Sequence, residues 1–269
     1  MADTTPQTDD RRYAFVDVVR EGRLTIVTLD RPEVLNALHG PAHRELHAVF
    51  DDFADDPDQW VAIVTGRGRA FCVGNDLKFQ AAGGSLDRPP SGFAGLTARH
   101  DLDKPVIAAV NGLALGGGFE IALACDIIVA SADARFALPE PKVGMAARCG
   151  GLHRLPRAIG LPQAMGMILT GRSVDADEGR TLGFVNAVTA PDQVMAEARR
   201  WAADILACSP LAVRAAKRVA HAGLTHPDIA EAVARQDEQP ALQAMIASDD
   251  FREGPRAFAE KRKPDWTGR

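Results

Sequence analysis

Three consecutive glycines, Gly116-Gly117-Gly118, most strongly constrain the fold of this chain. They lie between an apolar stretch, predicted to be a buried strand at Val106–Val110, and the apolar run Phe119–Cys125, which we expect to form a helix. The peptide N–H groups of these glycines should therefore be unpaired at a helix N-terminus, where partial positive charge favours an anion. Glycine also lets a ligand oxygen approach the backbone closely. The sequence thus predicts an anion hole at the start of this helix.

A phosphate-binding loop is the competing interpretation of the same glycines. A P-loop would continue with Gly-Lys-Ser or Gly-Lys-Thr, and a dinucleotide-binding turn would have Gly-x-Gly-x-x-Gly spacing. The stretch from Gly112 to Gly118 has neither pattern. A nucleotide loop and a dehydrogenase are therefore disfavoured.

The order of the predicted elements indicates an α/β fold. Strands at Tyr13–Arg20 and Leu24–Leu29 form an antiparallel pair joined by a turn at Glu21-Gly22. A helix at Pro41–Ala54 leads into a buried strand at Val61–Thr65. Further short strands are expected at Val106–Val110, Ile127–Ala130, Arg135–Leu138 and Phe184–Val188.

Three regions of the chain follow from this pattern. Residues 1–10 are polar and acidic and are predicted to be a disordered leader, and residues 11–191 form the core that carries the site. Residues 192–269 are predicted to be a helical C-terminal subdomain. Its expected helices cover 192–207, 210–222, 228–247 and 250–262.

Composition excludes several classes of function. The 269 residues are 46% hydrophobic, which is enough for a substantial core, and the net charge of -5 provides no basic field for nucleic acid or an anionic membrane. The sequence has no secretory signal and no apolar run long enough to span a bilayer, so a cytoplasmic location is expected. The four cysteines are scattered and lack metal-ligand spacing, so no metal is predicted.

Two further features suggest acid–base chemistry beside the glycines. In Phe71–Leu77, Gly74 would let the chain turn so that the Asn75 N–H points inward, although an ordinary turn is the alternative. Glu120 lies on the first turn of the predicted helix, and Glu140 follows a strand and lies between two prolines. Paired acids at an oxyanion site indicate proton transfer. For each acid alone, a salt bridge or a capping role is the alternative.

Together these stretches resemble the crotonase superfamily, the enoyl-CoA hydratase/isomerase family, from about Val18 to Lys263. The matching segments are Arg31-Pro32, Asn36–Leu38, Phe71–Leu77, Lys104–Gly112, Gly116–Glu120, Cys125-Asp126, Phe136–Glu140, Gly150-Gly151 and Arg154-Leu155. The resemblance is nearest to the carnitinyl-CoA dehydratase (crotonobetainyl-CoA hydratase) branch, through Gly92–Thr97, Phe136–Glu140, Glu260–Pro264 and Trp266.

The resemblance implies a spiral of ββα units with a helical C-terminal subdomain for trimerisation, in trimers that often pair as hexamers. It places an oxyanion hole at the backbone N–H groups of Asn75 and Gly117, and catalytic carboxylates at Glu120 and Glu140. It also implies that coenzyme A lies along a small set of residues. These are Ala37, Asn75, Asp76, Leu77 and Lys78, with Lys261 reaching coenzyme phosphate from a neighbouring subunit.

The implied reaction needs no cofactor, because coenzyme A is part of the substrate. Water attacks C3 of a 2-enoyl thioester while negative charge moves to the thioester oxygen, where two backbone donors stabilise it. One glutamate orients and deprotonates the water, and the other delivers a proton at C2. The sequence does not assign the two roles. An enoyl-CoA isomerase of the same fold and a non-catalytic CoA-thioester-binding protein remain the alternatives.

One loop departs from the family pattern. The family usually has Gly-x-x-Pro-Gly-x-Gly-Gly after the second glutamate, whereas this chain has GMAARCGG at residues 144–151. Arg148 therefore stands where a small glycine is usual. It either turns inward to pair with Glu120 or Glu140, or points to solvent or to a neighbouring subunit.

Overall fold

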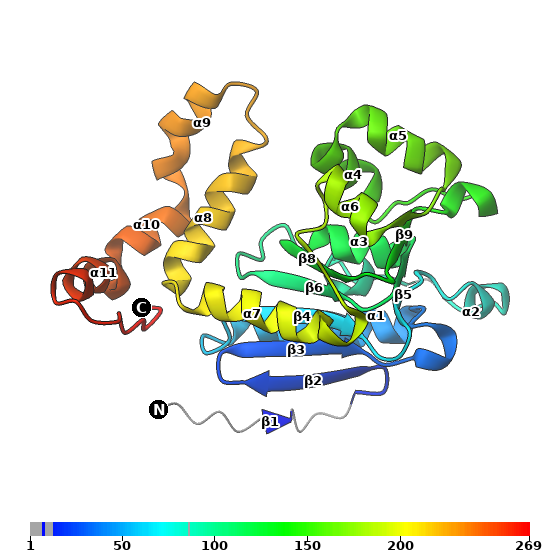
Figure 1. Cartoon of the computed structure of the whole chain (residues 1–269), viewed down its shortest axis with the longest axis horizontal. Helices are drawn as coiled ribbons and strands as arrows, with labels where there is room; N and C mark the ends of the chain where they lie inside the picture. Colours follow the sequence, from blue (N-terminus) through cyan, green and yellow to red (C-terminus); the bar gives the residue numbers. More distant parts are fainter. Residues whose placement is uncertain (1–6, 9–12, 86) are drawn as a thin grey trace.

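The computed structural model describes residues 7–8, 13–85 and 87–269, and it contains two β-sheets surrounded by helices (Figure 1). The larger sheet has seven strands in the order β1-β2-β3-β4-β6-β8-β11. Their bounds are β1 Gln7–Thr8, β2 Val16–Glu21, β3 Leu24–Leu29, β4 Val61–Gly66, β6 Val106–Val110, β8 Ile127–Ser131 and β11 Ala187–Thr189. The first three strands pair antiparallel, and the pairs from β3 to β11 are parallel. Strands β4 and β6 are buried along their whole length, as expected for apolar runs in a parallel sheet.

The smaller sheet has four strands in the order β10-β9-β7-β5. Their bounds are β5 Ala70–Cys72, β7 Leu113–Leu115, β9 Arg135–Ala137 and β10 Val174–Asp175. Each of β4, β6 and β8 is followed within a few residues by a strand of this sheet and then by a helix. These helices are α2 Leu77–Ala81, α3 Gly117–Ala124 and α4 Gly151–Ile159. The predicted spiral of ββα units is therefore confirmed.

Helices pack on both sides of the larger sheet. Helix α1 (Gly40–Asp55) buries Leu46, Phe50 and Phe53 in the same core cluster as the aromatic side chains of the smaller sheet and α3. Helix α7 (Val194–Leu206) buries Val194, Ala198 and Ala202, which recur every four residues and therefore share one helix face. That face covers strands β4, β6 and β8.

The remaining C-terminal helices extend away from the sheets (Figure 1). They are α8 Pro210–Gly223, α9 Ile229–Arg235, α10 Pro240–Ala247 and α11 Asp249–Ala259. The prediction of a single helix at 228–247 is wrong: this segment forms two helices separated by the 3-10 turn Gln236–Glu238. Pro240 causes the break, because a residue before proline avoids helical geometry, and Gln239 has an extended ψ of 121°.

Other sequence-based expectations need correction between residues 151 and 189. Helices α4, α5 (Leu161–Thr170) and α6 (Ala176–Leu182) were not predicted. The strand expected at Phe184–Val188 begins at Ala187, because the Phe184 N–H still bonds to the carbonyl of Gly179 in α6. Of the predicted leader, Gln7–Thr8 form β1, and residues 1–6, 9 and 10 lie outside the described residues.

Candidate active site

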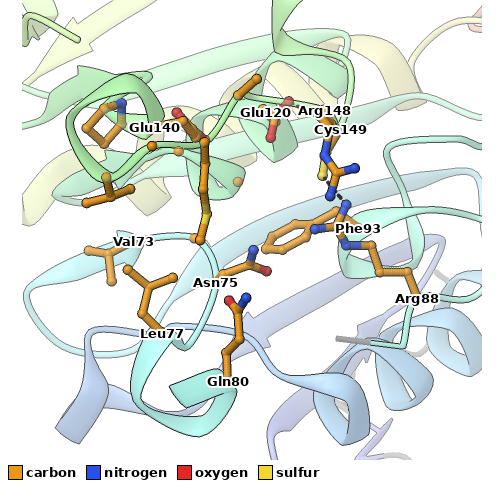
Figure 2. A pocket seen from close by; sticks show the side chains of 18 residues that line it. Val73, Asn75, Leu77, Gln80, Arg88, Phe93, Glu120, Glu140, Arg148 and Cys149 are labelled. Carbon is orange, nitrogen blue, oxygen red and sulfur yellow. Dashed lines mark hydrogen bonds between the residues drawn. The ribbon is translucent and has the colours of Figure 1, made fainter. Parts of the chain in front are cut away.

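A cavity of about 610 Å³ opens where the loops after β5, β7 and β9 meet (Figure 2). Its lining includes five predicted site residues, Asn75, Leu77, Gly117, Glu120 and Glu140. These residues come from three successive ββα units. The repeat of the fold is therefore what brings them together.

The glycine run forms one wall of the cavity. Gly116 is the N-cap of α3 and has a φ of 54°, a left-handed conformation that glycine adopts without strain. A Cβ at Gly116 would lie 2.9 Å from Glu140 Oε1, so the site needs glycine here for space as well. The next N–H, that of Gly117, begins the helix and has no acceptor among the described residues.

The loop after β5 brings a second backbone donor to the same wall. Gly74 has a φ of 92°, and a Cβ there would lie 3.0 Å from the Gly117 nitrogen. The loop is held by two backbone hydrogen bonds with Leu38, from Leu38 N to Gly74 O (2.8 Å) and from Asp76 N to Leu38 O (2.9 Å). Between them, the Asn75 N–H has no acceptor within the described part of the chain. Two unpaired N–H groups thus lie on loops in direct contact.

Glu120 is almost fully buried and its carboxylate is fixed by the backbone. Its Oε1 accepts hydrogen bonds from Cys149 N (2.7 Å) and Gly151 N (2.9 Å). Both donors belong to the loop and first turn that lead into α4. These two donors fix the position of the carboxylate at the cavity.

Glu140 faces the same cavity without such support. It begins the 3-10 helix Glu140–Val143, and its Oε2 is buried with no hydrogen-bond partner among the described residues. Burial raises the pKa of Glu140 to about 7, and the charge of Glu120 adds to the shift. The side-chain oxygens of Asn75 and Gln80, which also line the cavity, are likewise buried without a partner in the described chain. Such a concentration of unpaired polar atoms marks a ligand site.

The residues expected to contact coenzyme A have different surroundings. Leu77 is 44% exposed at the cavity, and Lys78 follows it on the exposed face of α2. The Asp76 carboxylate caps α2 at Phe79 N and forms an ion pair with Arg31 (3.0 Å). The carbonyl of Ala37 accepts a hydrogen bond from Arg31. Lys261 lies outside this group, since it follows α11, on the opposite side of the molecule from α2 (Figure 1).

Arg148 lines the cavity with its side chain exposed. Within the described residues it forms no ion pair with Glu120 or Glu140, so the inward pairing predicted as one alternative is wrong. A second arginine, Arg88, also lines the cavity and was not predicted. No motif in the sequence marks it, because it enters the site from a long loop that the pattern leaves undefined.

The described residues contain no group of three or more histidine, cysteine or acidic side chains able to hold a metal. Within the same residues, no helix is long and apolar enough to cross a membrane.

The ββα spiral and its helical C-terminal subdomain define a crotonase-type protein. A family model described as enoyl-CoA hydratase/isomerase matches residues 20–269, and the chain belongs to that family. A carnitinyl-CoA dehydratase of Citrobacter koseri is 45% identical over 256 residues, covering 93% of this chain and 97% of the relative. A carnitinyl-CoA dehydratase of Salmonella typhi is 43% identical over 256 residues, covering 94% of this chain and 98% of the relative.

A solved structure, enoyl-CoA hydratase from Mycobacterium tuberculosis H37Rv, has a TM-score of 0.89 and 39% identity to this chain. The match covers 96% of this chain and 100% of the chain in the solved structure. These matches confirm the predicted resemblance to the carnitinyl-CoA dehydratase branch and the predicted class of enzyme, an enoyl-CoA hydratase or dehydratase.

Proposed function

We propose that this cavity catalyses the reversible addition of water to a 2-enoyl-CoA thioester. The observation that carries the proposal is that one cavity holds two backbone N–H groups, unpaired within the described residues, and two differently held glutamates. The N–H groups of Asn75 and Gly117 bind the thioester oxygen as it becomes negative. One such donor is worth roughly 10²–10³ in rate.

The two glutamates have separate roles in this proposal. Glu120, held by the N–H groups of Cys149 and Gly151, accepts a proton from water while the water oxygen bonds to C3. Glu140, whose pKa is raised to about 7 by burial, is partly protonated near neutral pH and delivers its proton to C2. The glutamates exchange protons with solvent afterwards, so the net change is one added water. Elimination runs through the same steps in reverse.

Coenzyme A is proposed to lie along Ala37 and Asn75–Lys78, with no cofactor beyond the substrate. Leu77 offers an exposed apolar surface to the pantetheine arm, and Lys78 a charge beside it. Lys261 would then reach the coenzyme phosphates of a neighbouring subunit in a trimer or a pair of trimers. Exposed apolar side chains on the C-terminal helices, or directly after α8, support such an assembly: Leu224, Ile229, Val233, Phe251 and Phe258.

Product analysis distinguishes this proposal from the alternative of a non-catalytic CoA-thioester-binding protein. The purified protein should convert crotonyl-CoA to 3-hydroxybutyryl-CoA at a rate proportional to the enzyme concentration. Chromatography of the thioesters measures this conversion. Binding of crotonyl-CoA with no conversion, across saturated, 2-enoyl and 3-hydroxyacyl thioesters, would contradict the proposal.

A further inference from the structure

Two arginines line the catalytic cavity together. In Figure 2, Arg88 and Arg148 lie at one end of the cavity beside Phe93, whereas Val73 and Leu77 lie at the other end. Arg88 comes from the loop between α2 and the 3-10 turn Phe93–Gly95, and Arg148 from the loop before α4. This end of the cavity therefore carries two guanidinium groups, close to Cys149, whose N–H binds the Glu120 carboxylate.

Within the described residues, the contacts that hold Arg88 are with uncharged groups. Its Nη1 donates to Cys149 Sγ (3.0 Å), and its guanidinium carbon lies 5.6 Å from the centre of the Phe93 ring. Burial, followed by the charge of Glu120, raises the pKa of Cys149 to about 12, so this sulfur is a neutral thiol. By contrast, Arg31 and Arg99 each bind an aspartate. Neither Arg88 nor Arg148 has a carboxylate partner in the described chain.

The geometry of the proposed function decides which part of the substrate meets these charges. The thioester oxygen would lie at Asn75 and Gly117, and the coenzyme arm would leave along Leu77 and Lys78. The acyl chain must then run toward the other end of the cavity, where Figure 2 places Phe93, Arg88 and Arg148. The arginines thus face the far end of the acyl group.

We infer that the acyl group of the substrate carries a carboxylate at its far end, which Arg88 and Arg148 bind. The substrate class is the CoA monothioester of an unsaturated dicarboxylic acid. This inference rests on the proposed function and specifies its substrate. Guanidinium groups bind carboxylates through paired hydrogen bonds, and Cys149 and Phe93 already orient Arg88. The same charges repel a trimethylammonium group, which the acyl part of a carnitinyl thioester carries.

Three thioesters that differ only beyond C4 test the inference. Glutaconyl-CoA ends in a carboxylate, 5-methyl-2-hexenoyl-CoA carries an isosteric neutral isopropyl group, and crotonobetainyl-CoA carries trimethylammonium. For the unmodified protein, kcat/KM should be roughly 10- to 100-fold higher for glutaconyl-CoA than for the neutral thioester, as for hydrogen bonds to charged groups. It should be lowest for crotonobetainyl-CoA. Hydration of the neutral or cationic thioester with an equal or higher kcat/KM would overturn the inference and leave the proposed function standing.

Arginine variants test whether Arg88 and Arg148 cause the preference for a carboxylate. Arg88→Gln and Arg148→Gln should each reduce the ratio of kcat/KM for glutaconyl-CoA to that for the neutral thioester by about tenfold or more. Arg148→Glu should move the preference toward crotonobetainyl-CoA. Arg157→Gln, an exposed arginine of α4 that does not line the cavity, is the matched control and should keep the unmodified ratio. An unchanged ratio in both cavity variants would overturn the inference, whereas failure to hydrate any of the three thioesters would instead refute the proposed function.

Discussion

Glu120 and Glu140 face one cavity but differ in their hydrogen-bond partners: two backbone N–H groups bind the carboxylate of Glu120, whereas Glu140 Oε2 is buried with no partner in the described chain. The difference follows from local structure. Glu120 points at the N–H groups before and at the start of α4, and Glu140 begins a 3-10 helix where its Oε2 finds no partner among the described residues. A carboxylate held by two backbone donors suits a base, and the raised pKa of Glu140 suits an acid.

The first prediction concerns both acids. Glu120→Gln and Glu140→Gln should each lower kcat for hydration by roughly 10²-fold or more, because each removes one proton transfer. Circular dichroism should show an unchanged fold. Glu33→Gln, an exposed acid that does not line the cavity, is the control and should retain full activity. Near-normal turnover in both cavity variants would refute the assigned roles.

The second prediction is the pH dependence of the rate. Glu140 acts as an acid, so kcat/KM for hydration should fall as pH rises through about 7, the raised pKa that burial gives this group. A pH–rate profile with a basic limb near this value would agree. A profile flat from pH 6 to 9 would mean that Glu140 is not the proton donor.

The third prediction links the same pKa to stability. Since the folded pKa of about 7 lies above the ordinary value of 4.5, the folded state prefers neutral Glu140. The contribution of Glu140 to the free energy of unfolding should therefore decrease as pH rises from 4.5 to 7, and it is fully lost above 7. Glu140→Gln should accordingly raise Tm at pH 8 and change it little at pH 4. An equal change in Tm at both pH values would contradict this linkage.

The fourth prediction uses two glycines with similar backbone conformation. Gly74 has a φ of 92° and Gly83 a φ of 85°, but a Cβ at Gly74 would lie 3.0 Å from Gly117 N and from Leu115 O, whereas at Gly83 nothing lies within 4 Å. Alanine at either position should cost stability of order 1 kcal/mol from backbone strain. Only Gly74→Ala should also lower kcat, by about tenfold or more, because it displaces an oxyanion donor. Equal activity of the two variants would argue against the hole at Asn75 and Gly117.

The fifth prediction concerns the neighbouring subunit. Light scattering should give a trimer or a multiple of one. Lys261→Ala should raise KM for CoA thioesters but not for pantetheine thioesters, which lack the nucleotide phosphates. Lys263→Ala is the control for the loss of an exposed charge. A monomer at micromolar concentration, or equal KM changes for both thioester types, would contradict the proposed role of Lys261.

The sequence was informative where local signals determine structure. Gly116 and Gly74 have a positive φ, which glycine favours, so these two turns could be predicted from residue type and flanking strands. The contact of Arg88 with Cys149 spans 61 positions, and that of Glu120 with Cys149 spans 29. Such contacts depend on how loops of different units pack, which no short pattern encodes. For the same reason the sequence alone could not assign acid and base to the two glutamates.

Incubation of the unmodified protein with crotonyl-CoA in H₂¹⁸O and D₂O tests the central claim most directly. Mass spectrometry of the product should find one ¹⁸O at C3 and one deuterium at C2 of 3-hydroxybutyryl-CoA, with both lost in the Glu120→Gln, Glu140→Gln double variant. Deuterium exchange or movement of the double bond without ¹⁸O at C3 would contradict hydration and identify the protein as an isomerase.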